Sequence, residues 1–132
     1  MDIGKDLVAA SATPLVLAIL SEEESYGYAV IKRVRELSRG RIQWTDGMLY
    51  PVLHRLEQAG YIRSTWRESS SGRKRKYYEI TESGLAELVG QRRQWQVVDA
   101  TLRRIWPDVS GTIKRALGPL SSAQGARMTW WT

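Results

Sequence analysis

Four consecutive cations, Arg73 to Lys76, stand between two short stretches that resemble β-strands. Residues 61–67 alternate in the period of a half-buried strand, and residues 77–80 are rich in the aromatic and β-branched side chains that strands favour. Residues 63–76 carry six cations against one carboxylate, a net charge of +5. The sequence therefore predicts a β-hairpin with a polar, strongly basic tip, although a run of cations taken alone is more often a solvated loop.

An amphipathic helix is predicted just before this hairpin. Its apolar face holds Leu49, Val52, Leu53 and Leu56, which recur at the spacing of one helical face. Thr45 or Asp46 can cap the helix start, and Gly60 can end it. The opposite face is polar and aromatic without dense charge, whereas a merely solvated face is more often rich in Glu and Lys. It carries Gly47, Tyr50, Pro51, His54 and Gln58, with Met48 and Arg55 at its flank.

Two further helices are predicted upstream. Pro14 is expected to open a short helix through the apolar residues 15–20, buried on every side. Ser25 offers an N-cap for a second amphipathic helix, which should end near Gly40. Lys32 lies off the apolar stripe of that second helix, where its side chain can reach an anion.

A long final helix is predicted downstream of the hairpin, capped by Thr81 and ended by Pro107. Its apolar residues recur in near-heptad steps, which indicates a helix–helix seam, most simply with the same helix of a second subunit. Residues 108–132 shift to Gly, Ser, Pro and Ala and are predicted to form a flexible tail. The expected domains are residues 1–80, residues 81–107 and this tail.

Composition narrows the classes of function. The chain has a net charge of +6 and a pI of about 9.9, which favours an anionic partner, either nucleic acid or a membrane surface. No apolar stretch is long enough to span a membrane, and the N-terminus is unlike a signal peptide, so a cytoplasmic protein is expected. Cys is absent and His54 is the one histidine, which argues against an enzyme and excludes a thiolate metal site. No Gly-rich loop matches a dinucleotide-binding or P-loop pattern, so no cofactor is expected.

Three helices followed by a basic hairpin are typical of the winged helix-turn-helix domain. The predicted fold is therefore mainly α with a small β-hairpin, followed by a C-terminal dimerisation helix. The third helix fits the major groove of DNA, and the hairpin brings cations to phosphates or the minor groove. The alternative is a protein-interaction module whose basic hairpin does not read DNA. The candidate DNA contacts are Lys32, Thr45, Gly47, Met48, Tyr50, His54, Arg55, Ser70, Ser71, Gly72, Arg73, Lys74 and Arg75.

Residues 47–57 followed by residues 60–62 resemble the PadR family of bacterial transcriptional regulators. Residues 72–81 with Gly84 are similar to the wing and last-helix start of that family, and residues 26–28 to the opening of its second helix. The resemblance covers residues 12–106, and one C-terminal helix is similar to the shorter PadR subfamily. It implies a homodimer joined through the last helices, and a repressor that a small effector releases from its DNA operator.

The last helix also suggests an effector site. Multidrug-sensing relatives look similar at Trp95, with an acid shortly after it, here Asp99. A planar aromatic effector could stack between Trp95 and its copy, with Asp99 attracting a cationic ligand. Trp95 could equally pack the seam between the helices and bind nothing. The candidate effector and dimer-interface residues are Leu88, Arg92, Trp95, Asp99 and Leu102.

Overall fold

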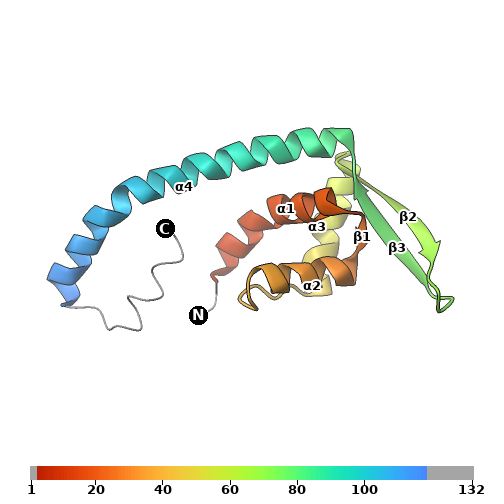
Figure 1. Cartoon of the computed structure of the whole chain (residues 1–132), viewed down its shortest axis with the longest axis horizontal. Helices are drawn as coiled ribbons and strands as arrows, with labels where there is room; N and C mark the ends of the chain where they lie inside the picture. The colour runs from red at the N-terminus through yellow and green to blue at the C-terminus, as the bar shows by residue number, and fades with distance from the viewer. Residues whose placement is uncertain (1–2, 119–132) are drawn as a thin grey trace. The chain divides into compact units, whose positions relative to one another are not determined.

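The computed structural model describes residues 3–118 (Figure 1). The helices and strands, in chain order, are α1 (Lys5–Glu22), β1 (Ser25–Tyr26), α2 (Gly27–Leu37), α3 (Asp46–Gln58), β2 (Ile62–Glu68), β3 (Lys74–Ile80) and α4 (Glu82–Leu117). This composition confirms the predicted class, mainly α with a small β-hairpin. The chain divides into two compact units, and the boundary between them falls within α4, between Arg92 and Arg93.

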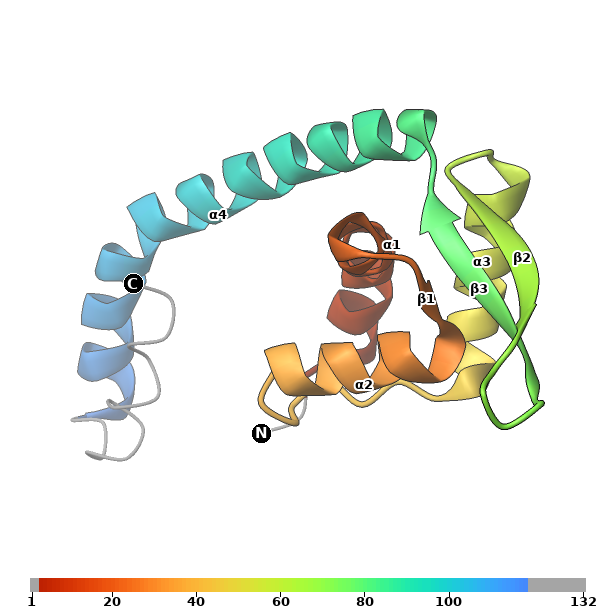
Figure 2. The ribbon, with the colours of Figure 1, turned by 45° about the vertical axis from the view of Figure 1, so that its right-hand side comes forward.

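The core of the first unit lies among α1, α2, α3 and the base of the β2–β3 hairpin (Figure 2). Helix α3 buries the predicted stripe against this core and exposes its opposite face. Trp44, in the segment between α2 and α3, is also buried and was not predicted to be. The largest fully buried side chains are Val16, Leu17, Val30, Val34, Leu49, Leu53 and Ile62.

The hairpin belongs to a three-stranded antiparallel sheet in the order β1-β3-β2. The ladder between β2 and β3 runs from the pair Ile62 and Ile80 at the base to Glu68 and Lys74 near the tip. Tyr78 is buried, whereas its neighbour Tyr77 lies on the opposite face, as the alternation of strand side chains requires. The hairpin was predicted, but its third strand was not.

The unpredicted strand β1 also explains why the start of α2 differs from the prediction. Ser25 does not cap α2, because Ser25 pairs with Tyr78 in β1 and Tyr26 occupies the N-cap position. A two-residue strand has too short a pattern to show in the sequence, since pairing with a distant strand defines it.

Pro14 does not open a helix either, because α1 begins at Lys5 and continues through Pro14. A proline inside a helix removes one backbone hydrogen bond and typically costs about 3 kcal/mol. Here α1 buries Ala12 on one side of the proline and Val16 and Leu17 on the other. Burial of these apolar side chains outweighs the local preference of proline.

Pro107 is likewise within a helix, since α4 runs on to Leu117. The prediction that Pro107 ends the helix was wrong, and so was a flexible tail starting at residue 108. A proline lacks one N–H group, so the turns that follow it can still form their own hydrogen bonds. The rest of the predicted tail, residues 119–132, lies outside the described residues.

The first turn of α4 packs closely against the base of the hairpin, and a substitution at Gly84 can test this packing. An ideal Cβ on Gly84 would lie 2.0 Å from the backbone oxygen of Tyr61 and 2.7 Å from Cγ1 of Ile80. We expect Gly84→Ala to destabilise the protein by about 2 kcal/mol or more, because backbone cannot move aside as a side chain can. Thermal and urea unfolding would measure the loss.

Gly90→Ala is the matched control in the same helix. Apart from the adjacent residues and the backbone of its own helix, an ideal Cβ on Gly90 meets no atom within 4 Å. It should stabilise the helix by up to about 1 kcal/mol, the usual gain in helix propensity. A Gly84→Ala variant as stable as the wild type would contradict the packing described here.

Candidate nucleic-acid interface

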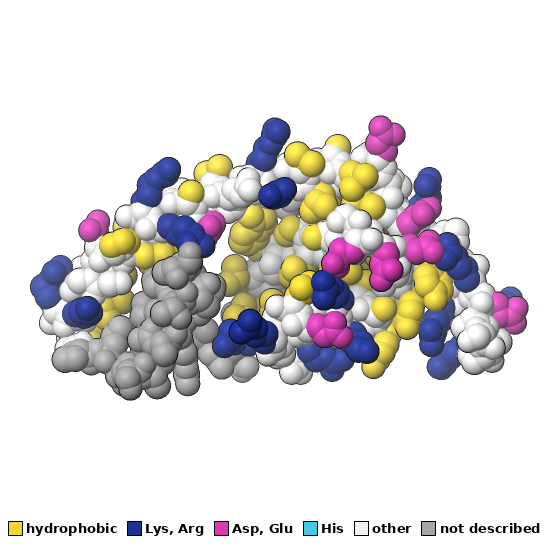
Figure 3. Space-filling view, in the orientation of Figure 1, with side chains coloured by type: hydrophobic (Ala, Val, Ile, Leu, Met, Phe, Trp, Pro, Cys, Tyr) yellow, Lys and Arg dark blue, Asp and Glu magenta, His cyan; other side chains and the backbone are white. Residues whose placement is uncertain are grey.

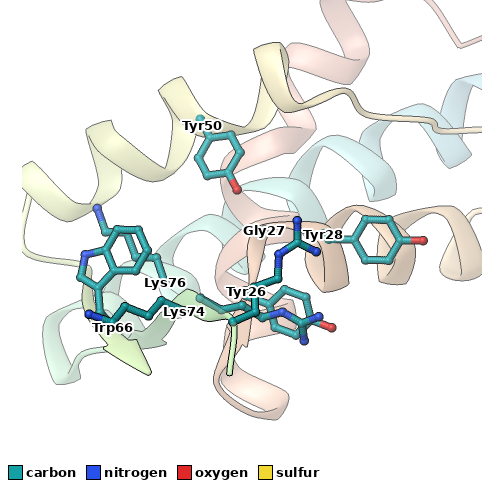
Figure 4. Close-up of a pocket in the computed structure, with 9 residues that line it drawn as sticks. Tyr26, Gly27, Tyr28, Tyr50, Trp66, Lys74 and Lys76 are labelled. Atoms are coloured by element: carbon teal, nitrogen blue, oxygen red, sulfur yellow. The ribbon is translucent and has the colours of Figure 1, made fainter. Parts of the chain in front are cut away.

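An open groove of about 580 Å³ lies between the start of α2, helix α3 and the β2–β3 hairpin (Figure 4). Four aromatic and four basic side chains line it together with one glycine, and no acidic side chain does. Aromatic rings beside cations suit the sugar–phosphate backbone of a nucleic acid. We call this surface the aromatic–basic groove, defined by Tyr26, Gly27, Tyr28, Tyr50, Trp66, Arg73, Lys74, Arg75 and Lys76.

Helix α3 forms one wall of the groove, and its sequence fixes how it is presented. Thr45 is the N-cap residue, and its hydroxyl accepts a hydrogen bond from the backbone N–H of Met48 at 3.3 Å. Because the apolar stripe is buried, the opposite face must be exposed: 46% of Tyr50 is accessible, and His54 is exposed one turn further on. This exposed face flanks the groove.

Tyr50 packs closely against the first residue of α2. An ideal Cβ on Gly27 would lie 2.6 Å from the Tyr50 hydroxyl oxygen, so only glycine leaves room for the tyrosine in this position. In Figure 4 the Tyr50 side chain extends from α3, with its hydroxyl group on the side that faces Gly27. The glycine between two tyrosines in residues 26–28 thus shapes the wall of the groove.

The hairpin tip presents its cations through a compact turn. The Ser69 N–H donates to the Arg73 carbonyl oxygen at 2.8 Å, and the Gly72 N–H donates to the Ser69 carbonyl oxygen at 2.9 Å. Gly72 has a φ of 81°, which a side chain would disfavour. Arg73 and Lys74 are exposed, and Figure 3 shows basic side chains around the hairpin and over α2.

Glu57, in the last turn of α3, connects the helix to the base of the hairpin. Its carboxylate accepts a hydrogen bond from the Ser64 hydroxyl and lies 3.8 Å from the Lys76 ammonium. Lys76 also lies over the ring of Tyr78, 5.6 Å from its centroid. Burial, followed by the nearby Glu57 charge, raises the pKa of the Tyr78 hydroxyl. These contacts set where the hairpin leaves the core.

Trp66 is a groove residue that the sequence reasoning did not single out. Its side chain is 67% exposed, and it pairs across the ladder with Lys76. Figure 4 shows Trp66 on the hairpin side of the groove with Lys74 and Lys76. The alternation of Trp66 with Ile62 and Ser64 correctly indicated that the three share one face of β2. It did not indicate that β2 extends beyond the core, which leaves Trp66 exposed.

Several residues predicted to contact DNA do not line the groove. Arg55 donates to the Thr13 hydroxyl at 3.0 Å, so its side chain is directed to α1. Lys32 lines a neighbouring hollow, which shares Tyr26 and Tyr28 with the groove and also contains Glu22, Glu23 and Glu36. Of the remaining candidates, Met48 packs partly against the core, Gly47 is exposed at the start of α3, and Ser70 and Ser71 are exposed at the hairpin tip.

The predicted effector and dimer-interface residues all lie on α4. In the first unit, Leu88 packs partly against the core, and Arg92 is exposed. In the second unit, Trp95 is half-buried, Leu102 is 39% exposed, and Asp99 accepts a hydrogen bond from Nε of Arg103 at 2.9 Å. The carboxylate proposed to attract a cationic ligand is therefore already paired within its helix.

No helix among residues 3–118 combines the length and the apolar character that crossing a bilayer requires. Nor does this part of the chain bring three His, Asp or Glu side chains together in a way that could hold a metal ion.

Comparison with known proteins places these features in context. Residues 16–89 match the sequence profile of the Transcriptional regulator PadR-like family. The transcriptional regulator YqjI of Escherichia coli is 32% identical over 89 residues, a match that covers 67% of this chain and 41% of YqjI. The matched region therefore spans less than half the length of that relative.

Solved structures extend the likeness to three dimensions. A PadR-like transcriptional regulator from Bacillus cereus has a TM-score of 0.68 at 30% identity, with 77% of this chain and 97% of that chain covered. A PadR family regulator from Clostridium difficile has a TM-score of 0.65 at 31% identity, with 73% and 98% covered. The arrangement of the helices and of the β2–β3 hairpin, which is the wing of this fold, is thus shared with solved transcriptional regulators.

Gly27→Ala tests the contact that shapes the groove. The added methyl group would meet the far end of the Tyr50 side chain, which can rotate, so we expect a loss of stability below about 1 kcal/mol together with a displaced Tyr50 ring. NMR of the tyrosine ring resonances would report the displacement. Gly47→Ala is the control, because its methyl group would lie 3.8 Å from the Thr45 hydroxyl oxygen, an ordinary van der Waals distance. Unchanged Tyr50 resonances in Gly27→Ala would contradict the close contact.

Proposed function

Because this chain belongs to the PadR-like family of transcriptional regulators, we propose that it is a sequence-specific repressor that binds its DNA operator as a homodimer. Its family is one of transcription regulators rather than enzymes. The observation that carries the proposal is the aromatic–basic groove beside the exposed face of α3. A basic groove next to a polar, aromatic helix face offers contacts to both phosphates and base edges.

In the proposed complex, α3 enters the major groove and the hairpin follows the adjacent backbone. Tyr50 and His54 project from the exposed side of α3, where their polar atoms can meet base edges. Arg73 and Lys74 are exposed at the hairpin tip, where they can neutralise phosphates. Trp66 offers an apolar surface on which a deoxyribose can pack.

We propose that α4 forms the dimer interface. Its second part exposes the apolar side chains of Val97, Val98, Leu102 and Ile105, which a matching helix could cover. A two-fold dimer of winged helices would read two half-sites about 10 bp apart, roughly one turn of DNA. Such an operator should be a near-palindrome.

An effector that binds near Trp95 is the proposed release mechanism. Trp95 lies one helical turn before Asp99, and Asp99 already forms an ion pair with Arg103. A cationic planar ligand would therefore share or displace this ion pair, while a neutral ligand would need only the ring stack. Binding would favour a dimer conformation in which the two wings no longer fit the operator.

The roles of wing and helix can be separated by salt dependence. The variant Arg73→Gln/Lys74→Gln removes two proposed phosphate contacts, so the slope of log affinity against log salt should become shallower by about 0.9 for each cation. Fluorescence anisotropy with DNA from the protein's own promoter would measure it. His54→Ala should instead lower affinity for the promoter by about 1–3 kcal/mol and leave the slope unchanged.

Arg63→Gln is the matched control on the same hairpin. Arg63 lies at the base and pairs with Glu79 at 2.5 Å, so its loss should leave the slope unchanged. A slope that does not respond to the loss of Arg73 and Lys74 would favour a protein-interaction module with a nonspecific basic wing.

Trp95→Ala tests the effector site. If planar ligands stack on Trp95, this substitution should weaken the binding of planar cationic dyes at least tenfold, as measured by dye fluorescence. Trp66→Ala removes an indole from the groove instead and should leave dye affinity unchanged. Undiminished binding to Trp95→Ala would restrict Trp95 to packing between the helices.

A further inference from the structure

A series of contacts connects the segment before β1 to the outer part of the hairpin. Arg67 is the second-to-last residue of β2, and both terminal nitrogens of its guanidinium donate to the Glu24 carboxylate. The Nη2 to Oε2 distance is 2.6 Å. A bidentate ion pair of this kind fixes direction as well as distance.

The series continues through two aromatic rings to a cation of the groove. The Arg67 guanidinium carbon lies 5.1 Å from the ring centroid of Tyr77. The rings of Tyr77 and Tyr26 meet edge to face, with centroids 5.3 Å apart and planes at 65°. The Arg75 guanidinium carbon lies 4.5 Å from the centroid of Tyr26. Glu24 is therefore connected by direct contacts to Arg75, which lines the aromatic–basic groove.

The outer hairpin has little else to hold it. The buried residues of the hairpin, Ile62 and Tyr78, lie at its base, and β1 pairs with β3 only at Tyr77 and Tyr78. Beyond that point the hairpin is a two-stranded ribbon with exposed residues, and such a ribbon is marginally stable by itself. The ion pair acts on this part, since Arg67 pairs across the ladder with Arg75.

The ion pair between Glu24 and Arg67 reduces the positive charge of a surface that is proposed to attract DNA. Glu24 adds a negative charge there and occupies Arg67, a cation that could otherwise contact a phosphate. The hydrogen bonds from Arg67 lower the pKa of Glu24 below its ordinary value of 4.5. The contribution of the pair is therefore present above that pH and is lost as the pH falls through the lowered pKa.

We propose that Glu24 and Arg67 are positioning residues, which orient the outer hairpin and so place Arg75 for contact with DNA. This inference rests on the proposed function. Arg67 then serves the complex through Glu24 and not as a phosphate contact, and Glu24 favours specific binding despite its charge.

Glu24→Gln distinguishes positioning from simple electrostatics, because the two predict effects of opposite sign. The substitution raises the net charge by one unit, so electrostatic attraction alone predicts tighter binding to all DNA. Loss of positioning predicts about fivefold weaker binding to promoter DNA, with unchanged or tighter binding to random DNA. Anisotropy titrations of both DNAs would measure the ratio.

Glu22→Gln is the matched control. Glu22 accepts two hydrogen bonds from Arg33, at 3.1 and 2.9 Å, so the same substitution removes an equivalent exposed ion pair with the same gain in charge. Arg33 belongs to α2, so the hairpin should not respond. The double variant Glu24→Arg/Arg67→Glu should recover most of the preference for promoter DNA, which a merely lost contact would not.

A measurement without DNA keeps the inference separate from the proposed function. Amide hydrogen exchange of residues 66–75 should be faster in Glu24→Gln than in the wild type and in Glu22→Gln, with similar unfolding temperatures for all three. If the wild type does not prefer promoter DNA, the proposed function fails. Hydrogen exchange then still tests whether the Glu24–Arg67 ion pair holds the outer hairpin in place. Promoter binding by Glu24→Gln as tight as that of Glu22→Gln, or unchanged exchange, would overturn the inference.

Discussion

Burial of one face of α3 determines where the proposed DNA-binding surface lies. Leu49 and Leu53 are completely buried, and Val52 and Leu56 lie beside them against the core. In a helix, burying these positions leaves the residues between them no choice but to face outward. Tyr50 and His54 are presented in this way, and the Thr45 cap sets where the helix begins. The chemistry of the exposed face is thus free to vary, while the apolar face keeps its orientation.

The hairpin divides into two parts that are held by different forces. Its base belongs to the hydrophobic core through Ile62 and Tyr78, and Glu57 connects it to α3 through Ser64 and Lys76. Its outer part is polar and exposed, and its contacts with the rest of the chain are ion pairs and ring contacts. Such contacts are individually weak, so a small free energy can change the orientation of the tip. This low cost of reorientation would allow the wing to adjust to DNA, and it would also allow an effector to displace the wing.

Local patterns were sufficient to predict much of this fold. Four features each depend on a few neighbouring residues. They are the periodicity of α3, the alternation in the hairpin, the Thr81 cap of α4 and the positive φ of Gly60. The features that were missed depend on distant residues. Strand β1 exists because Ser25 pairs with Tyr78, and the ion pair between Glu24 and Arg67 joins residues 43 positions apart. The hydrogen bond from Arg55 to Thr13 likewise joins residues that are far apart in the sequence. Pro14 and Pro107 were predicted as boundaries on local preference, whereas both lie within helices.

We propose that the exposed face of α3 and the aromatic–basic groove together recognise one DNA sequence. Fluorescence anisotropy can measure this, by titrating the wild-type protein into DNA from its own promoter and into random DNA of equal length at two salt concentrations. Sequence-specific recognition predicts tighter binding to the promoter DNA at both salt concentrations and weaker binding to both DNAs at the higher one. Equal, weak binding to the two DNAs would contradict it and would reduce the basic hairpin to a nonspecific surface.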